Sequence, residues 1–150
     1  MGDDATRMDE KTSPRLNPIG HVQSELTDPG DAPRQAHLGA PPARIEFTKE
    51  FEAHAADSQT GDTIWILTWL DRASRDTAAV HPEGNPNNPR TGIFSTRAPH
   101  RPNPIGLHRA TITARDHNSI TVNALEALNG TPVLDIKPVL PEELRPLPDR

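Results

Sequence analysis

Short runs in which apolar and polar residues alternate recur along this chain and predict a sheet of many short strands. The alternating runs are 21–24, 44–47, 106–115, 119–125 and 133–136. A period of two residues places successive side chains on opposite faces of a strand, so each run offers one face to a core. Loops rich in proline and glycine separate the runs. The pattern favours a mainly-β sandwich or barrel with short helices and long Pro-rich loops.

The same alternation predicts which side chains face the core. In 106–115 and 119–125 the inward positions are Ala110, Ile112, Ala114, Ile120, Val122 and Ala124. The run Thr63 to Leu70 is apolar on both faces and rich in β-branched residues, which predicts the central strand. Within it, Trp65 and Trp69 suit core packing better than stacking on a base.

Between these runs the sequence predicts loops, one helix and a further strand. Residues 25–42 and 71–90 are loops rich in Pro, Gly and polar residues. A strand is expected over 91–96, and a short helix over 49–55 with Thr48 as its cap. Asn129-Gly130 is a typical turn dipeptide. These elements make one domain over 15–141, with polar tails at 1–14 and 142–150.

Composition narrows the class of protein. Only 33% of the 150 residues are hydrophobic, and 17 are proline, so the core is small. A partner chain covering one face would help such a core, and this favours a homodimer. The chain has no cysteine, which excludes a disulfide frame and a thiolate metal site and fits a reducing, cytoplasmic compartment. No apolar run is long enough for a transmembrane helix, so we expect no membrane association.

The segment from Gly92 to Leu107 carries the clearest candidate chemistry. Pro99, Pro102 and Pro104 restrict their own φ angles and the residues before them, and so hold the segment extended. Arg97 and Arg101 lie within this stiff path. Guanidinium groups bind carboxylate or phosphate through two parallel hydrogen bonds. The segment therefore presents arginines to an anion, or else its arginines tie the loop to backbone carbonyls.

Charge is unevenly distributed. The net charge is −5, which argues against non-specific nucleic-acid binding through overall charge. Residues 90–109 nevertheless contain no acidic residue and carry four arginines and two histidines, namely Arg90, Arg97, Arg101, Arg109, His100 and His108. This stretch is a candidate local basic patch, although the sequence favours no ligand contact for its two histidines. The seven histidines show no metal-ligand spacing, so no metal site is expected.

One tetrapeptide occurs twice. Asn17-Pro18-Ile19-Gly20 precedes the first predicted strand, and Asn103-Pro104-Ile105-Gly106 precedes the strand over 106–115. The repeat is either a device for starting a strand or a coincidence in a short string.

Several ordered motifs carry a family resemblance. They are Asn17 to Val22, Pro33-Arg34-Gln35, Trp65-Ile66-Leu67, Gly92 to Leu107 and Asn129 to Pro138. In this order, over about residues 17–141, they resemble the TsaA/TrmO-like family, the S-adenosylmethionine-dependent tRNA methyltransferases. The resemblance implies a TsaA-like β-barrel that works as a dimer. It also implies methyl transfer from S-adenosylmethionine to the exocyclic amine nitrogen of threonylcarbamoyl-adenosine beside the anticodon of threonine tRNA.

The resemblance also assigns residues to roles. The methyl donor's pocket would draw on Gln35, Ala36, His37, Asp71, Arg72, Arg97, Leu107, Asn123, Ala124, Leu125 and Glu126. Arg97, Asp135 and Lys137 are the candidates for the catalytic group. His100, Arg101 and Arg109 are the candidates for contacts to nucleic acid. The nucleophilic nitrogen must lose a proton, and Asp71, Glu126 or Asp135 are alternative acceptors.

The sequence departs from the family pattern at several positions. Ala36-His37 replaces Pro-Gly, Asp71 stands where His is frequent, Asn129 replaces Asp, and Val139 replaces Tyr. The additional C-terminal domain of some members is also absent from this sequence. These departures leave two alternatives open. The same fold would methylate a small molecule or another acceptor, or it would bind S-adenosylmethionine without catalysis.

Overall fold

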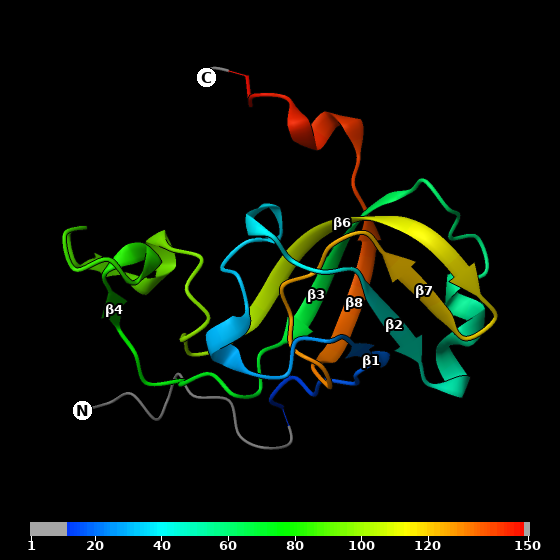
Figure 1. Cartoon of the computed structure of the whole chain (residues 1–150), viewed down its shortest axis with the longest axis horizontal. Helices are drawn as coiled ribbons and strands as arrows, with labels where there is room; N and C mark the ends of the chain where they lie inside the picture. Colours follow the sequence, from blue (N-terminus) through cyan, green and yellow to red (C-terminus); the bar gives the residue numbers. More distant parts are fainter. Residues whose placement is uncertain (1–11, 149–150) are drawn as a thin grey trace.

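Six antiparallel strands form a closed sheet in the computed structural model, which describes residues 12–148 (Figure 1). Their order is β1-β2-β7-β6-β3-β8, and β8 pairs with both β3 and β1, so the sheet closes on itself. Their bounds are β1 Gly20–Gln23, β2 Ala43–Phe47, β3 Thr63–Trp69, β6 Ile105–Asp116, β7 Ser119–Val122 and β8 Pro132–Pro138. The predicted mainly-β class is confirmed.

The core lies inside the closed sheet and comes from the inward positions of alternating strands. The least exposed side chains, at 0–1% of their surface, include Val22, Ile45, Ile66, Ile112, Ile120, Val122, Leu125 and Val133. β3 was predicted to be central, and it pairs with β6 on one side and β8 on the other. Its inward side chains are Ile64, Ile66 and Thr68. Trp65 and Trp69 face outward and are half-buried, so their predicted core packing is wrong.

The alternation of β6 and β7 breaks earlier than the sequence predicts. The register between β6 and β7 shifts between Ile112 and Ala114, so Ala114 leaves the core side and is exposed. An irregularity of this kind adds a residue to one strand and turns the following side chains over. β7 ends at Val122, and Ala124 lies beyond the strand instead of on its inner face. Two of the predicted core alanines are therefore outside the core.

The helices of the described residues are short 3-10 turns. They are η2 Pro29–Asp31, η3 Ala36–Leu38, η4 Lys49–Ala55, η5 Pro82–Gly84, η6 Ile93–Ser95 and η7 Pro141–Leu144. η4 matches the predicted helix. Thr48 precedes it, but its side chain does not cap it: the hydroxyl donates to the Ile19 carbonyl at 3.4 Å. The predicted tight turn is confirmed, and Gly130 has a φ of 86°.

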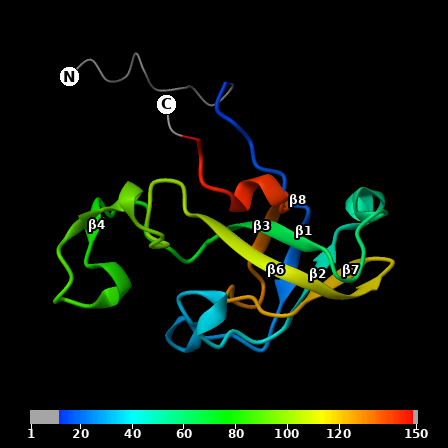
Figure 2. The same ribbon diagram turned by 90° about the horizontal axis from the view of Figure 1, so that it is seen from above.

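A lobe of residues 71–104 projects from the end of the β3–β6 hairpin to one side of the closed sheet (Figures 1 and 2). It contains a two-stranded sheet of β4 Ala79–Val80 and β5 Thr91–Gly92. The strand predicted over 91–96 is therefore wrong after Gly92. The chain turns into η6 there, because Ile93 folds inward and is buried within the lobe, at 3% exposure.

One side-chain contact joins the described C-terminal residues to the sheet. Residues 1–11, most of the predicted N-terminal tail, fall outside the described range, as do 149 and 150. On the C-terminal side, the Trp65 indole N–H donates to the Glu143 carboxylate at 2.8 Å. η7, which begins at the predicted end of the domain, is thereby attached to the outer face of β3.

Candidate functional site

Four of the predicted donor-contact residues meet at one pocket of about 240 Å³. Ala36 and His37 come from η3, while Asn123 and Ala124 come from the connection between β7 and β8. The remaining lining residues come from the start of β3 and from the part of β6 that pairs with it, namely Thr63, Arg109, Ala110 and Thr111. Four segments of the chain therefore build one concavity, and the guanidinium group of Arg109 borders it.

Backbone pairing fixes the position of Asn123 in this pocket. Its N–H donates to the Thr111 carbonyl at 3.0 Å, and its side-chain oxygen accepts from the Thr111 N–H at 2.9 Å. The side-chain Nδ2 donors have no hydrogen-bond partner within residues 12–148, and the residue is exposed. Asn123 can therefore donate hydrogen bonds to a bound ligand without losing its own anchoring.

The other wall of the pocket is set by the loop over 25–42. Gln35, half-buried, precedes η3, and Gly39 ends it with a φ of 102°, a conformation that favours glycine. Ala36 and His37 are therefore presented on a single tight turn. The Leu125 N–H donates to the Pro41 carbonyl at 3.0 Å and joins this loop to the β7–β8 connection.

Leu125 and Glu126 do not line the pocket. Leu125 is fully buried in the core, so its side chain faces away from the concavity. Glu126 also reaches inward, and its Oε1 lies 2.5 Å from His108 Nδ1. The four residues predicted as one binding stretch are thus divided between the pocket wall and the interior behind it.

The predicted catalytic pair of β8 lies on the outer face of the sheet. The strand pairing places Asp135 of β8 beside Leu67 of β3, and Leu67 beside Leu107 of β6. Two residues further along the same face, Lys137 lies beside Trp65, and Trp65 lies beside Arg109. Asp135 and Lys137 form an ion pair with an Oδ2–Nζ distance of 3.2 Å. Since Arg109 lines the pocket and belongs to this row, the outer face borders the pocket.

The remaining predicted residues lie in the lobe. They are Asp71, Arg72, Arg97, His100 and Arg101. The pocket is at the start of β3, whereas the lobe follows its end, and seven residues of strand span roughly 20 Å. The loop over 25–42 contacts both regions, because Arg34 donates to the Glu83 carbonyl of the lobe and Ala36 lines the pocket. Arg72 also donates to this loop, at the Thr27 carbonyl, at 3.3 Å.

The two signature arginines have different surroundings. The Arg101 guanidinium donates to the carbonyls of Thr96, Ala98 and Ile93 at 3.1, 2.9 and 3.4 Å. Arg97 is exposed and makes no hydrogen bond to another residue of the 12–148 range. The contacts of Arg101 match one of the two alternatives that the sequence allowed, and the guanidinium group of Arg97 leaves the other alternative as a prediction. Arg101 ties the loop together, and Arg97 is available to an anion.

Replacing Arg101 by alanine is expected to destabilise the lobe by about 1–3 kcal/mol, since three carbonyls lose a charged donor. Hydrogen exchange of the Thr96 N–H, which bonds to the Ile93 carbonyl, measures local opening. Arg90→Ala is the matched control, because Arg90 is an exposed arginine of the same lobe. Equal exchange rates in both variants would contradict the structural role of Arg101.

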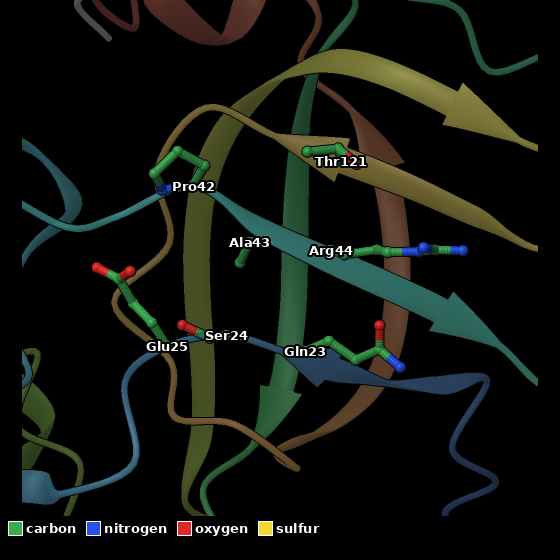
Figure 3. Close-up of a pocket in the computed structure, with 7 residues that line it drawn as sticks. All are labelled: Gln23, Ser24, Glu25, Pro42, Ala43, Arg44 and Thr121. Carbon is green, nitrogen blue, oxygen red and sulfur yellow. The ribbon is translucent and has the colours of Figure 1, made fainter.

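A larger concavity of about 340 Å³ lies elsewhere, across β1, β2 and β7 (Figure 3). None of the sequence-predicted site residues line it. Glu25 and Arg44 extend in opposite directions there (Figure 3). Arg44 is already engaged, with Asp116 at 3.9 Å and Asn118 at 3.4 Å. The charged groups of this concavity do not converge on one point, so it is a weaker candidate for a binding site than the pocket of Ala36 and Asn123.

Residues 12–148 contain no group of three or more His, Cys, Asp or Glu side chains placed to hold a metal ion. No helix among them is long and apolar enough to cross a membrane.

Residues 21–143 match the family profile of the tRNA-methyltransferase O N-terminal domain. A probable S-adenosyl-L-methionine-binding protein from Archaeoglobus fulgidus is 41% identical over 83% of this chain and 33% of its own length. An S-adenosyl-L-methionine-binding protein from the same organism is 39% identical over 85% of this chain and 90% of its own. The chain thus spans a third of the first relative and most of the second.

Solved structures agree with the profile. A crystal structure of TrmO from Pseudomonas aeruginosa superposes with a TM-score of 0.70 at 28% identity, covering 93% of this chain and 60% of that one. A second crystal structure of TrmO gives 0.72 at 29% identity, covering 93% and 63%. The chain spans less than two thirds of both. The resemblance inferred from the sequence motifs is confirmed: this chain belongs to the family of the tRNA-methyltransferase O N-terminal domain.

Proposed function

We propose that this protein binds S-adenosylmethionine in the pocket of Ala36, His37, Asn123 and Ala124 and transfers its methyl group to tRNA. The acceptor is the exocyclic amine nitrogen of threonylcarbamoyl-adenosine next to the anticodon. The observation that carries the proposal is the pocket itself, where two segments that are distant in the sequence bring together residues that the family resemblance assigned to the donor. Relatives named as S-adenosyl-L-methionine-binding proteins support the choice of ligand.

The residues of the pocket fit such a ligand. S-adenosylmethionine supplies an electrophilic methyl group on a sulfonium, together with an adenine, a ribose and an amino-acid carboxylate. The free Nδ2 donors of Asn123 suit an acceptor on adenine or ribose. Arg109, bordering the pocket, suits the carboxylate. Since 240 Å³ lies below the usual range of small-molecule pockets, the concavity accommodates only part of the ligand.

The chain's task in transfer is alignment and removal of a proton. Holding the acceptor nitrogen in line with the methyl carbon lowers the barrier without a metal or a covalent residue. The nitrogen–carbon bond forms as the sulfur–carbon bond breaks, and the nitrogen's proton passes to a carboxylate. Asp135 is the proposed acceptor, because it lies on the outer face that borders the pocket. Lys137 orients it through their ion pair.

Recognition of the RNA is proposed for the lobe. Arg97 is exposed with a free guanidinium, and His100, three residues further along the chain, is also exposed. The phosphates of the anticodon loop are suitable anions for them. Because the lobe and the pocket lie beyond opposite ends of β3, the tRNA would extend across both regions. The proposal places the protein in the cytoplasm, where its tRNA substrate is found.

We also propose a homodimer, formed through the outer face of β3 and β6. Ile105 and Leu107 are 41% and 40% exposed, and Trp65, Leu67 and Trp69 are half-buried beside them. A contiguous apolar face of this kind is typical of an interface. Ile105→Asp is expected to convert a dimer to a monomer in light scattering after gel filtration, whereas Leu16→Asp, another exposed apolar residue, leaves the mass unchanged. Wild-type protein that is still monomeric at a concentration of about 100 µM would contradict this proposal.

The decisive test uses labelled S-adenosylmethionine with two tRNA pools, one carrying the threonylcarbamoyl modification and one lacking it. Label in the modified pool alone is the expected result. Label in neither pool, with the donor still bound in calorimetry, would support a different acceptor or a non-catalytic binding domain. Failure to bind the donor would overturn the proposed function.

A further inference from the structure

A hydroxyl, an imidazole and a carboxylate are joined in series inside the closed sheet. His108 of β6 is 5% exposed; its Nε2 lies 2.7 Å from Thr68 Oγ1 and its Nδ1 lies 2.5 Å from Glu126 Oε1. Thr68 is fully buried, so this row is not a nucleophile for an external substrate. A neutral imidazole pairs both of its ring nitrogens here, with Nδ1–H donating to Glu126 Oε1 and Nε2 accepting from the Thr68 hydroxyl.

Glu126 depends on this histidine. Its second oxygen, Oε2, is shielded from solvent and has no hydrogen-bond partner among the described residues. Within residues 12–148, the Glu126 carboxylate forms a hydrogen bond only with His108. A buried carboxylate that loses its partner is costly, so removal of the imidazole would drive Glu126 out of the interior.

The contact between His108 and Glu126 affects the pocket because Glu126 lies close in the sequence to the pocket wall. Glu126 lies three residues after Asn123 and two after Ala124, and these two residues form one wall of the pocket. Leu125 between them is fixed by burial and by its N–H bond to Pro41. The wall is therefore a short connection anchored at one end by β7 pairing and at the other by the His108–Glu126 contact.

We propose that His108 is a positioning residue: by holding Glu126 inside the sheet it fixes the Asn123–Ala124 wall against which the methyl donor binds. The inference rests on the proposed function, since it deepens the account of the same pocket. It also gives a role to a residue that the sequence left as a possible phosphate contact or as no contact at all. His108 is directed into the sheet, away from any RNA.

Three variants separate this role from simple core packing. Asn places its amide donor near the position of Nδ1, so His108→Asn preserves the link to Glu126 and loses the one to Thr68. His108→Leu removes both links at similar volume. Thr68→Val removes only the Thr68 hydroxyl and is the matched control.

Calorimetric titration with S-adenosylmethionine is expected to give wild-type-like affinity, within about threefold, for Thr68→Val and His108→Asn. His108→Leu is expected to bind about 10- to 100-fold more weakly, the range for loss of a hydrogen bond to a charged group. Equal affinity in His108→Leu and wild type would overturn the inference, and so would equal weakening in His108→Asn and His108→Leu. Circular dichroism and thermal unfolding establish that each variant is folded.

A second readout needs no ligand. Hydrogen exchange of the Leu125 N–H, which bonds to Pro41, is expected to accelerate in His108→Leu and to stay near wild type in His108→Asn. If wild-type protein bound no S-adenosylmethionine, the proposed function would fail while this exchange pattern still tested the positioning role. Unchanged exchange in His108→Leu would overturn that role whatever the ligand.

Discussion

Replacing Gly20 by alanine is expected to destabilise the protein by about 3 kcal/mol or more, among the largest effects of any single methyl group in this fold. A Cβ at Gly20 would lie 2.9 Å from the carbonyl carbon of Glu46 and closer still to its oxygen. That carbonyl belongs to β2, which pairs with β1 beginning at Gly20 opposite Phe47. The methyl group can be accommodated only if the two strands separate, because backbone atoms cannot rotate away.

Urea unfolding followed by fluorescence of the two tryptophans measures the change. Gly92→Ala is the matched control, since a Cβ there meets nothing within 4 Å and its φ of −58° suits alanine. The control is expected to change the free energy of unfolding by less than about 1 kcal/mol in either direction. If Gly20→Ala unfolded at the same urea concentration as the control, the close approach of β1 and β2 would be contradicted.

The second copy of the repeated tetrapeptide obeys the same steric rule with different neighbours. A Cβ at Gly106 would lie 2.6 Å from His108 Nε2 and nearer to Thr68 Oγ1. Both copies lead into a strand, β1 or β6, at a point where another group occupies the space of a side chain. The glycine of each copy therefore lies at a crowded position near the start of a strand. Gly106→Ala is expected to be milder than Gly20→Ala, because side chains can shift where a carbonyl cannot.

The elements that periodicity could predict are those whose burial alternates without interruption. β2, β3 and β8 were found within a few residues, since their inward positions follow the chain regularly. The strand over 91–96 failed after Gly92 because Ile93 serves the core of the lobe, and no local pattern distinguishes that burial from a strand face. Ala114 failed because a register shift is a property of two strands together.

The site was predicted in part for a related reason. Motif resemblance grouped Ala36, His37, Asn123 and Ala124, which line one concavity in the structure, although composition and spacing could not have joined segments so far apart. The inward turn of Glu126 was missed, because one residue of offset reverses the direction of a side chain. His108 was missed as its partner, since a histidine in a basic stretch reads as a surface residue until the register of β6 is known.

Conversion of Arg97 to lysine is expected to lower kcat/KM for methylation of threonylcarbamoylated tRNA by about 10- to 100-fold. Arg97 is exposed, has no hydrogen bond within residues 12–148, and lies in a segment stiffened by Pro99, Pro102 and Pro104. Its guanidinium is thus held ready for a carboxylate or phosphate without competing contacts. Lysine keeps the charge but loses the second parallel hydrogen bond, which supplies about 1.5–3 kcal/mol when the acceptor is charged.

Arg90→Lys is the matched control, because Arg90 is exposed in the same lobe and is expected to retain nearly full activity. Separate measurement of the dissociation constant for S-adenosylmethionine and of KM for tRNA assigns the anion. A weaker donor complex in Arg97→Lys would mean that Arg97 holds the donor's carboxylate, which requires the lobe to reach a pocket beyond the far end of β3. Unchanged donor binding with a raised KM for tRNA would place the anion on the RNA. Full activity in Arg97→Lys would eliminate bidentate binding at this position, and the rigid proline path would then have to be explained by the Arg101 carbonyl contacts alone.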